Sequence, residues 1–358
     1  METDGHFSDD YGPQRLSVEL ANICNLHCSY CFRSEDNLYS HHAEFFPLEL
    51  LRRIIDEARA AAQITRVSFT GGEPTLHPKF SEILETVGAG GLTASFVTNG
   101  WHFERTWPAL TANRKAVSHV AFSLDGVDRE THDRWRGKGS FDRLIRAFSR
   151  CYMAQLPFAL KIVVRRDLGD QLERIAIFAA RMGAAALNFV HVMPTSSEFE
   201  NDVTLNREEQ RAAEEEIALL ARIFKMKIGI DVGYYNIDEQ RAPCSPLAGT
   251  SMNVDYRGRL SLCCNLSGFR NAAGEPDVVA DLNVEPFSTA LVKLRALAAA
   301  QLEKRRNALV TLRSRGVTPD LYAGSPCLFC LQSYGKIPWH NGSSEFRSSE
   351  SNSSEFSL

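Results

Sequence analysis

Three cysteines in one short segment are the residues of this chain best suited to chemistry: Cys24, Cys28 and Cys31. They are separated by three and then two residues, and they follow the strand-like run Leu16–Ala21. Thiolates bind iron–sulfur clusters, and a cluster of four irons ordinarily takes four of them. Three thiolates leave one iron open to a substrate, whereas a zinc site would need a fourth ligand such as His27. The spacing indicates an iron–sulfur cluster with an open iron, with zinc as the alternative.

A second motif follows the next strand-like run. Arg66–Thr70 leads directly into the segment Gly71–Pro74, which is two glycines, an acid and a proline. Glycine has no Cβ, so a ligand can approach its backbone closely. A glycine pair alone would indicate only a turn between a strand and a helix. A glycine pair that follows both a strand and the cysteine segment indicates a ligand site.

The two motifs together resemble the signature of the radical S-adenosylmethionine (radical SAM) superfamily, CxxxCxxC followed by GGEP. The resemblance extends from about Leu16 to Cys330. It implies an enzyme whose three cysteines hold a [4Fe-4S] cluster with SAM at the open iron. Reductive cleavage of SAM would give methionine and a 5′-deoxyadenosyl radical, which abstracts hydrogen from a substrate carbon. A flavodoxin- or ferredoxin-type protein is the implied electron donor.

The resemblance also implies contacts between both motifs and SAM. Gly71 and Gly72 would meet the methionyl amino group, with Glu73 as an acceptor for that cation and Pro74 fixing the turn. Tyr30 occupies the position at which family members pack an aromatic or apolar residue against the adenine. An ordinary core aromatic is the alternative for Tyr30.

Further SAM contacts are expected where the third and fourth strand-like runs end. Ser123 and Asp125 resemble the residues that hold the ribose and the methionyl carboxylate, and Asn99 is a further candidate. Arg136 and Arg165 are candidates for the SAM carboxylate, because arginine pairs with carboxylates through two hydrogen bonds. Polar residues at strand ends are also ordinary turn formers, and either arginine can equally be a surface charge.

A second group of cysteines lies toward the C-terminus. The spacing of Cys244, Cys263, Cys327 and Cys330 resembles the SPASM/Twitch extension of the superfamily, which holds auxiliary clusters. No cysteine follows Cys330, so the resemblance is to the shorter Twitch version with one auxiliary [4Fe-4S] cluster. Neighbouring strand residues point to opposite faces, so only one of Cys263 and Cys264 should ligate, and the family register selects Cys263. A structural zinc site with four cysteines is the alternative.

The remaining thiols, Cys264 and Cys151, are expected to be structural, because buried free cysteine is common. A hydrogen-donor role for Cys264 is a further hypothesis, motivated by its place beside an auxiliary ligand. The total of nine cysteines is odd and clustered. In a chain without an export signal, this pattern favours metal ligands in the reducing cytoplasm over disulfides.

Short apolar runs alternate with segments of helical period, which predicts an α/β fold with βα units around a parallel sheet. The resemblance implies a partial (β/α)6 TIM-like barrel over residues 16–233, with ligands at the carboxyl ends of the strands. The predicted strands are Leu16–Ala21, Arg66–Thr70, Thr93–Thr98, Ser118–Leu124, Pro157–Val164 and Ala186–Met193. The predicted helices are Pro47–Ala62, Pro78–Val87, Phe103–Asn113, Phe141–Ala154, Gln171–Met182 and Asn206–Phe224.

A small α+β domain of Twitch/SPASM type is expected over residues 234–339, after a boundary near 234–243. It should contain a hairpin over Ser251–Cys263 that turns at Arg257 and Gly258, and a largely helical segment over residues 285–315. Residues 1–15 are expected to form a flexible leader. The Ser-rich tail over residues 340–358 is expected to be disordered.

Composition excludes several classes of function. The chain has 358 residues, of which 44% are hydrophobic and 23% charged, with a net charge of -4. No apolar run approaches the roughly 18 residues that span a bilayer, and the polar N-terminus does not resemble a signal peptide. The charge balance gives no case for nucleic-acid binding. A cytoplasmic enzyme that needs neither a membrane nor nucleic acid is expected.

The resemblance leaves the substrate open. Twitch enzymes resemble two functional sets, one remodelling small polar metabolites such as aminocyclitols or sugars, the other modifying ribosomally made peptides. The missing extra cysteines, and the lack of a peptide-recognition domain before Leu16, favour oxidation or remodelling of a small metabolite. Peptide oxidation, epimerisation or cross-linking is the alternative. A non-catalytic iron–sulfur sensor is a third hypothesis, although a sensor needs neither an open iron nor a SAM site.

Overall fold

The computed structural model describes residues 15–33, 42–196, 200, 202–238, 244–267 and 275–340. Structural statements below concern these residues. The predicted leader and Ser-rich tail lie outside them, apart from Arg15 and His340.

Six parallel strands form the centre of the sheet, and they are hydrogen-bonded in the order in which they occur in the chain. The predicted partial barrel is confirmed, with each strand within three residues of its expected bounds at either end. Their apolar side chains belong to one continuous core. These strands are β1 (Arg15–Glu19), β2 (Arg66–Thr70), β3 (Thr93–Thr98), β4 (Val117–Leu124), β5 (Phe158–Val164) and β6 (Ala186–His191).

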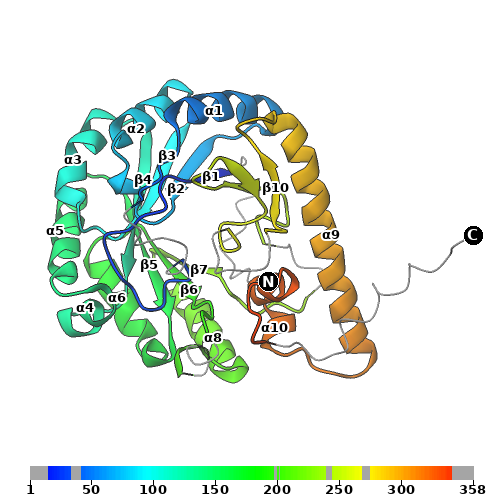
Figure 1. The fold of residues 1–358 in the computed structure, drawn as a ribbon. Helices are drawn as coiled ribbons and strands as arrows, with labels where there is room; N and C mark the ends of the chain where they lie inside the picture. The colour runs from blue at the N-terminus through cyan, green and yellow to red at the C-terminus, as the bar shows by residue number, and fades with distance from the viewer. Residues whose placement is uncertain are drawn as a thin grey trace, which may run out of the picture.

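Helices cover the outer face of the curved sheet, as Figure 1 shows. Their buried residues recur at helical spacing and pack against the strands, which is how an amphipathic helix joins a core. Two short 3-10 turns, Pro74–Leu76 and Arg166–Leu168, follow β2 and β5. The helices are α1 (Leu48–Ala62), α2 (Phe80–Ala89), α3 (Phe103–Ala112), α4 (Arg129–Arg136), α5 (Ser140–Met153) and α6 (Leu172–Arg181).

The sequence analysis missed a seventh parallel strand. β7 (Lys227–Val232) pairs with β6 and follows helix α8 (Arg207–Ile223). β7 lies at one edge of the sheet and carries a lysine and an aspartate, and charged side chains are typical of edge strands. These charges interrupt the apolar pattern by which the other six strands were recognised.

The predicted hairpin is present and extends the same sheet. β8 (Ser251–Val254) and β9 (Arg259–Ser261) are antiparallel, and β10 (Val278–Asp281) pairs with β9. β8 also pairs in parallel with β1, so the sheet continues without a break from β10 to β7. β1 is therefore hydrogen-bonded on both sides. The proposed domain boundary falls between β7 and β8, partly in residues 239–243, which lie outside the described residues.

Three helices complete the C-terminal region. The long helix α9 (Phe287–Ser314) confirms the helical prediction and packs against α1, β9 and β10. Figure 1 shows it running along the flank of the molecule between α1 and α10. The other two are α10 (Leu321–Gly324) and α11 (Pro326–Ser333), and Ser325 caps the start of α11. α11 carries Cys327 and Cys330, and residues three apart share one face of a helix.

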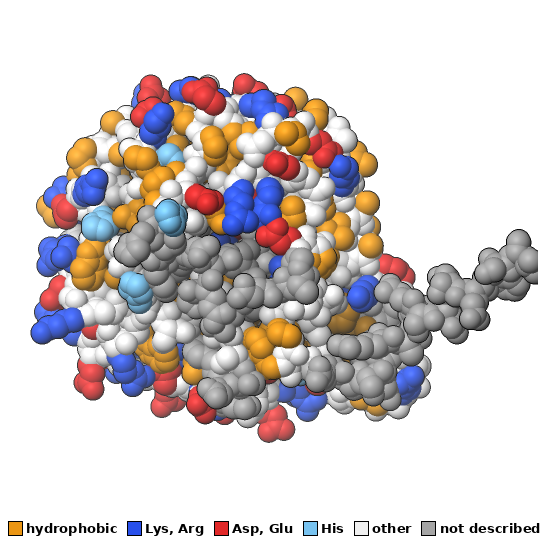
Figure 2. All heavy atoms as spheres, in the orientation of Figure 1, with side chains coloured by type: hydrophobic (Ala, Val, Ile, Leu, Met, Phe, Trp, Pro, Cys, Tyr) orange, Lys and Arg blue, Asp and Glu red, His pale blue; other side chains and the backbone are white. Residues whose placement is uncertain are grey.

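The surface carries mixed charges. On the face in Figure 2, acidic and basic side chains are interspersed, and a small group of basic side chains near the middle is flanked by acidic ones. No helix among the described residues combines the length and apolar character that crossing a membrane requires.

Candidate active site

The cysteine segment begins where β1 ends, and the glycine motif after β2 holds it there. The backbone N–H groups of Gly72 and Glu73 donate to the carbonyls of Ala21 and Ile23, each at 2.8 Å. Gly71 has φ +126°, and a Cβ at this position would lie 2.6 Å from the Ala21 carbonyl oxygen. The absence of a Cβ at Gly71 is thus needed by the chain itself, which passes close to this glycine.

The three cysteines lie in a small cluster of packed side chains that is separate from the main core. Cys28 is buried and Cys24 and Cys31 are half-buried, and the Cys31 N–H donates to the Cys28 carbonyl at 3.0 Å. Burial raises the pKa of Cys24 to about 12 and also raises the pKa of Cys28 and of Cys31. The apolar residues packed around them are Leu26, Tyr30, Trp101, Trp135, Val163 and Val192. Bound metal would be needed to deprotonate these thiols.

The donor set suits an iron–sulfur cluster better than a single metal ion. Among the described residues, no three His, Cys, Asp or Glu side chains are placed to hold one ion. In a four-iron cluster each thiolate binds a different iron, so the thiolates need not converge on one point. His27, the candidate fourth zinc ligand, is exposed. The buried Asn25 Nδ2 in the same segment has no hydrogen-bond partner among the described residues.

Glu73 joins the end of β2 to the end of β3. Its buried carboxylate accepts hydrogen bonds from the Thr98 hydroxyl at 2.7 Å and from the Asn99 N–H at 2.8 Å. It also accepts from the N–H and the hydroxyl of Thr75, directly after Pro74. Burial raises the pKa of Glu73 despite these donors. The Glu73 carboxylate thus forms hydrogen bonds to neighbouring residues of the protein, and its contact with SAM remains a prediction.

Asn99 connects the end of β3 to the cysteine segment. Its Nδ2 donates to Asn25 Oδ1 at 3.0 Å and lies 3.7 Å from the sulfur of Cys24. Its Oδ1 accepts from the Trp101 N–H at 2.9 Å. The side chain predicted to contact SAM therefore lies beside the first cysteine.

Four of the predicted residues meet at the ends of β4 and β5. The fully buried Asp125 accepts hydrogen bonds from the Tyr30 hydroxyl at 2.5 Å, from Arg165 at 2.7 Å and from Arg136 Nε. Arg136 also donates to the Tyr30 oxygen at 2.6 Å. Neither arginine is a surface charge, so that alternative is wrong. Both guanidinium groups already bind a carboxylate, so a role in holding the SAM carboxylate remains a prediction.

Electrostatics keep Asp125 ionised. Burial raises the pKa of this carboxyl, but the guanidinium groups of Arg136 and Arg165 outweigh that effect and bring its pKa down to about 2. Arg165 also donates to Asp167 at 3.1 Å and stacks 4.1 Å from the Trp135 ring centre. In this cluster, the carboxylates of Asp125 and Asp167 offset the charges of the two arginines. The cluster contacts the cysteine segment through Tyr30.

Two residues near Asp125 complete this part of the site. Ser123 is half-buried near the end of β4, and its predicted contact with the SAM ribose is not tested by the structure. His132 was missed by the sequence analysis. It is fully buried, and its Nδ1 accepts from the Asp125 N–H at 3.1 Å. Burial lowers the pKa of His132 to about 4, so the imidazole is neutral near pH 7.

The second group of cysteines converges from three parts of the chain. Cys244, Cys263, Cys327 and Cys330 line one cavity, whose other walls are mostly apolar. Burial raises the pKa of Cys244 and brings the pKa of Cys327 to about 12. Cys264 does not line this cavity. Both Cys263 and Cys264 follow β9 and lie outside any strand, so the alternation of strand side chains does not explain this difference.

Neighbouring groups point at the sulfurs of this second group. The Gly233 N–H lies 3.3 Å from the sulfur of Cys327, and Gln301 Nε2 lies 3.4 Å from that of Cys330. Such donors tune iron–sulfur clusters and orient their ligands. Gln301 is on α9, 29 residues before Cys330 in the sequence, and no local pattern marked it.

A buried ion pair links the two groups of cysteines. Arg33 lies two residues after Cys31 and donates to both carboxylate oxygens of Glu19 on β1, at 2.9 and 2.5 Å. Its guanidinium also lies 3.4 Å from the Cys264 carbonyl, and Asn253 of β8 donates to Glu19 at 3.3 Å. The sequence signal was an acid inside an apolar strand, which requires a partner.

The last cysteine is remote from both groups. Cys151 lies on α5 in the main core and is fully buried, and burial raises its pKa to about 12. This environment supports the structural role predicted for it.

Residues 18–179 match the family model of the Radical SAM superfamily. This span contains the three cysteines, the glycine motif and the Asp125 cluster. Residues 18–179 thus form a domain of the radical SAM superfamily. A domain of this family implies SAM and a [4Fe-4S] cluster as cofactors, and Cys24, Cys28 and Cys31 remain the predicted cluster ligands.

Two curated relatives of this radical SAM chain are named as maturation proteins. The mycofactocin maturase MftC of Mycolicibacterium smegmatis is 33% identical over 204 residues, which cover 56% of this chain and 50% of the relative. The sporulation killing factor maturation protein SkfB of Bacillus subtilis is 27% identical over 180 residues, covering 49% and 42%. The chain spans about half the length of these relatives.

The fold is also similar to that of a protein whose structure was solved with S-adenosylmethionine bound. Streptococcus suis SuiB bound to S-adenosylmethionine superimposes with a TM-score of 0.62 over 79% of this chain and 68% of SuiB. The sequence identity is 16%, so the likeness concerns the fold.

Substitution of Gly71 tests how the radical SAM glycine motif holds the cysteine segment. In Gly71→Ala the new Cβ would meet the Ala21 carbonyl, and we expect the free energy of unfolding to fall by about 2–4 kcal/mol. The matched control is Gly335→Ala, at φ +66° with no atom within 4 Å of the added carbon, which should lose about 1 kcal/mol. Urea unfolding of the metal-free protein measures both. Equal losses would contradict the steric account.

Substitution of Asp125 tests the charge cluster. Asp125→Asn leaves two buried guanidinium groups undercompensated, and we expect a loss of about 3–5 kcal/mol in the free energy of unfolding. Asp142→Asn, which removes an exposed partner of Arg129, should cost under about 1 kcal/mol.

The pH dependence of the Asp125→Asn difference follows from the depressed pKa. The stabilisation by Asp125 should be constant above about pH 4 and diminish as the pH falls toward 2. Urea unfolding at several pH values measures it, and a difference that already disappears near pH 6 would contradict the assignment.

Proposed function

We propose that this chain is a radical SAM enzyme that modifies a ribosomally made peptide. The observation that carries the proposal is the meeting, at one edge of the parallel sheet, of the cysteine segment, the glycine motif and the Asp125 cluster. Two relatives named as maturation proteins support the peptide as substrate.

The first cofactor site is the cysteine segment. Cys24, Cys28 and Cys31 would hold the [4Fe-4S] cluster, and bound SAM and cluster together supply the 5′-deoxyadenosyl radical. The chain orients and shields this site. Trp101, Trp135 and the residues around them exclude water, and Asn99 lies beside the first cysteine sulfur.

The Asp125 cluster is the second element of the proposed SAM site. Asp125 fixes the directions of Arg136 and Arg165 and of the Tyr30 hydroxyl. The polar end of SAM would bind at the rim of this cluster, with Ser123 toward the ribose. Because the donors are held by buried hydrogen bonds, they would need little rearrangement when SAM binds.

We assign the second group of cysteines to an auxiliary [4Fe-4S] cluster. Its support is the cavity that Cys244, Cys263, Cys327 and Cys330 line together, and the N–H groups aimed at two of the sulfurs. Four thiolates satisfy four irons, so this cluster would have no open iron. The auxiliary cluster would carry an electron during oxidation of the substrate. A flavodoxin- or ferredoxin-type protein would be the external electron donor, and the enzyme would act in the cytoplasm.

We propose a peptide as the substrate in place of the small metabolite that the sequence analysis favoured. That expectation rested on missing features, namely extra cysteines and an N-terminal recognition domain. The relatives named for mycofactocin and sporulation killing factor maturation favour the alternative. Cysteine number reports the number of auxiliary ligands and not the shape of the substrate site, so it is a weak guide to the substrate class.

Anaerobic reconstitution with iron and sulfide tests the radical chemistry. The wild-type chain should hold about eight irons in two clusters and should form 5′-deoxyadenosine from SAM under dithionite. The triple variant Cys24/Cys28/Cys31→Ala should keep about half of the iron and form none. Cys151→Ala is the control, because this thiol is remote from both groups. Formation of 5′-deoxyadenosine by the triple variant, or by neither protein, would contradict the proposal.

A displayed peptide library tests the substrate class. The reconstituted enzyme, SAM and reductant should change the mass of a subset of peptides, in proportion to the 5′-deoxyadenosine formed. Aminocyclitols and sugars serve as the comparison set. If these small molecules are consumed while every peptide in the library keeps its mass, the peptide assignment is wrong.

A further inference from the structure

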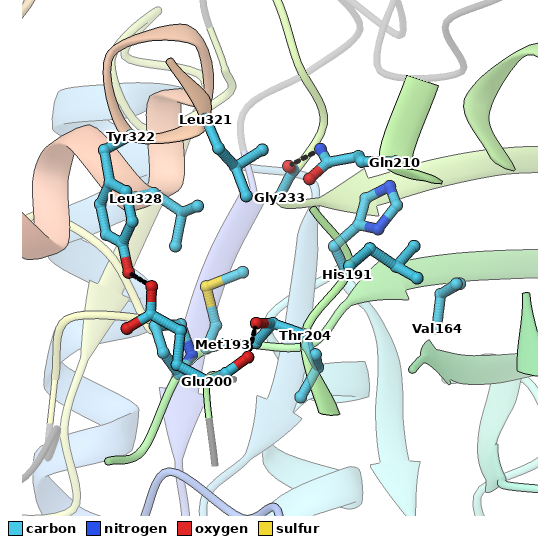
Figure 3. Close-up of a pocket in the computed structure, with 13 residues that line it drawn as sticks. Val164, His191, Met193, Glu200, Thr204, Gln210, Gly233, Leu321, Tyr322 and Leu328 are labelled. Carbon is cyan, nitrogen blue, oxygen red and sulfur yellow. Dashed lines mark hydrogen bonds between the residues drawn. The ribbon is translucent and has the colours of Figure 1, made fainter. Parts of the chain in front are cut away.

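A cavity outside both cysteine groups opens at the carboxyl ends of β5, β6 and β7. Val164, His191 and Gly233 come from these strand ends, and helices α10 and α11 close the cavity from the C-terminal side (Figure 3). In a parallel α/β sheet, this edge is where ligands bind. The sequence analysis did not assign His191 or its neighbours.

The cavity adjoins the cysteine segment. Val192 lines the cavity and also packs in the cluster of side chains that contains Cys28 and Tyr30. A group bound in the cavity would therefore lie next to the place where the radical forms, and hydrogen abstraction requires such proximity.

His191 is the unsatisfied polar group of this cavity. The side chain is 4% exposed, and neither ring nitrogen makes a hydrogen bond to another described residue. Nε2 lies 3.3 Å from Glu214 Oε1, outside hydrogen-bonding geometry. That oxygen already accepts from Gln210 and from the Tyr235 N–H, each at 2.8 Å. A buried imidazole without a partner is costly, and a ligand with a donor or acceptor would satisfy it.

The backbone that follows β7 lies close to His191. Gly233 has φ +85°, and a Cβ there would lie 2.6 Å from His191 Cβ and 3.0 Å from Met193 Cε. The Gly233 carbonyl accepts from Gln210 Nε2 at 2.7 Å, a bond drawn beside His191 in Figure 3. The Gly233 backbone, directly after β7, thus packs against Cα and Cβ of His191.

The charge of the lining restricts the ligand. Glu200 is the one acidic side chain among the described lining residues, and no lysine or arginine is among them. Its carboxylate accepts from the Tyr322 hydroxyl and from Trp339 Nε1, the latter at 2.9 Å. Most other lining side chains are aliphatic or methionine. An anionic ligand would meet a carboxylate with no cation to offset it, whereas an apolar group would gain burial.

We propose that this cavity receives one apolar side chain of the peptide substrate, with His191 hydrogen-bonded to the adjoining backbone amide. This deepens the proposed function and rests on it. It assigns His191 as a substrate contact, and it excludes acidic side chains and nucleotides from this position.

Calorimetry with blocked amino acids tests the assignment. The probes are N-acetyl-leucine amide, N-acetyl-phenylalanine amide, N-acetyl-aspartate amide and GTP, titrated into the reconstituted enzyme with SAM bound. The two apolar probes should bind at least tenfold more tightly than the two anionic ones. His191→Gln should weaken apolar binding by about threefold to tenfold, the effect of one lost hydrogen bond.

Two further variants keep the test decisive. His119→Gln, a half-buried histidine on β4 away from the cavity, should bind the probes like the wild type. Leu321→Phe fills part of the cavity from α10 and should weaken apolar binding even if His191→Gln unfolds. Equal binding of apolar and anionic probes, absence of apolar binding, or unchanged affinity in both cavity variants would overturn the proposal.

The same samples separate this inference from the proposed function. If 5′-deoxyadenosine forms and peptides change mass, but the probes give one of the three contradicting results above, only the cavity assignment is wrong. If no 5′-deoxyadenosine forms, the proposed function fails whatever the cavity binds.

Discussion

The buried ion pair between Glu19 and Arg33 is the interaction on which both cysteine groups depend. Glu19 belongs to β1, the strand that pairs with β2 on one side and β8 on the other, while Arg33 follows Cys31. The same guanidinium approaches the carbonyl of Cys264, next to Cys263. Loss of one partner from such a buried pair costs about 3–5 kcal/mol. One pair thus connects the segment after Cys31 with the segment that carries Cys263.

The rest of the site follows from the parallel sheet. Every strand from β1 to β6 runs in the same direction, so each delivers its next residues to one edge. The cysteine segment leaves β1, Gly71 follows β2, Asp125 follows β4, and Arg165 follows β5. His191 closes the row at the end of β6. The chemistry of SAM and the proposed substrate cavity therefore share one edge, with Val192 between them.

Local patterns predicted much of this arrangement. The six central strands, their helices apart from the short α4, and the cysteine spacing could be predicted because each depends on nearby residues. Contacts between distant segments could not. Tyr30 and Asp125 are 95 residues apart in the sequence, and only the fold shows that Asp125 binds both arginines. β7 was missed because its charged side chains interrupt the apolar strand pattern. The sequence also does not show which segment of the chain packs against Gly71.

The central claim is that one chain builds two iron–sulfur sites, of which only the first has an open iron. Anomalous diffraction at the iron edge, from anaerobically reconstituted crystals with SAM, tests it most directly. The account predicts two four-iron peaks, one at Cys24, Cys28 and Cys31 with SAM on the fourth iron. The other peak should be enclosed by the four C-terminal cysteines. A single iron peak, or a zinc edge at the second site, would contradict it.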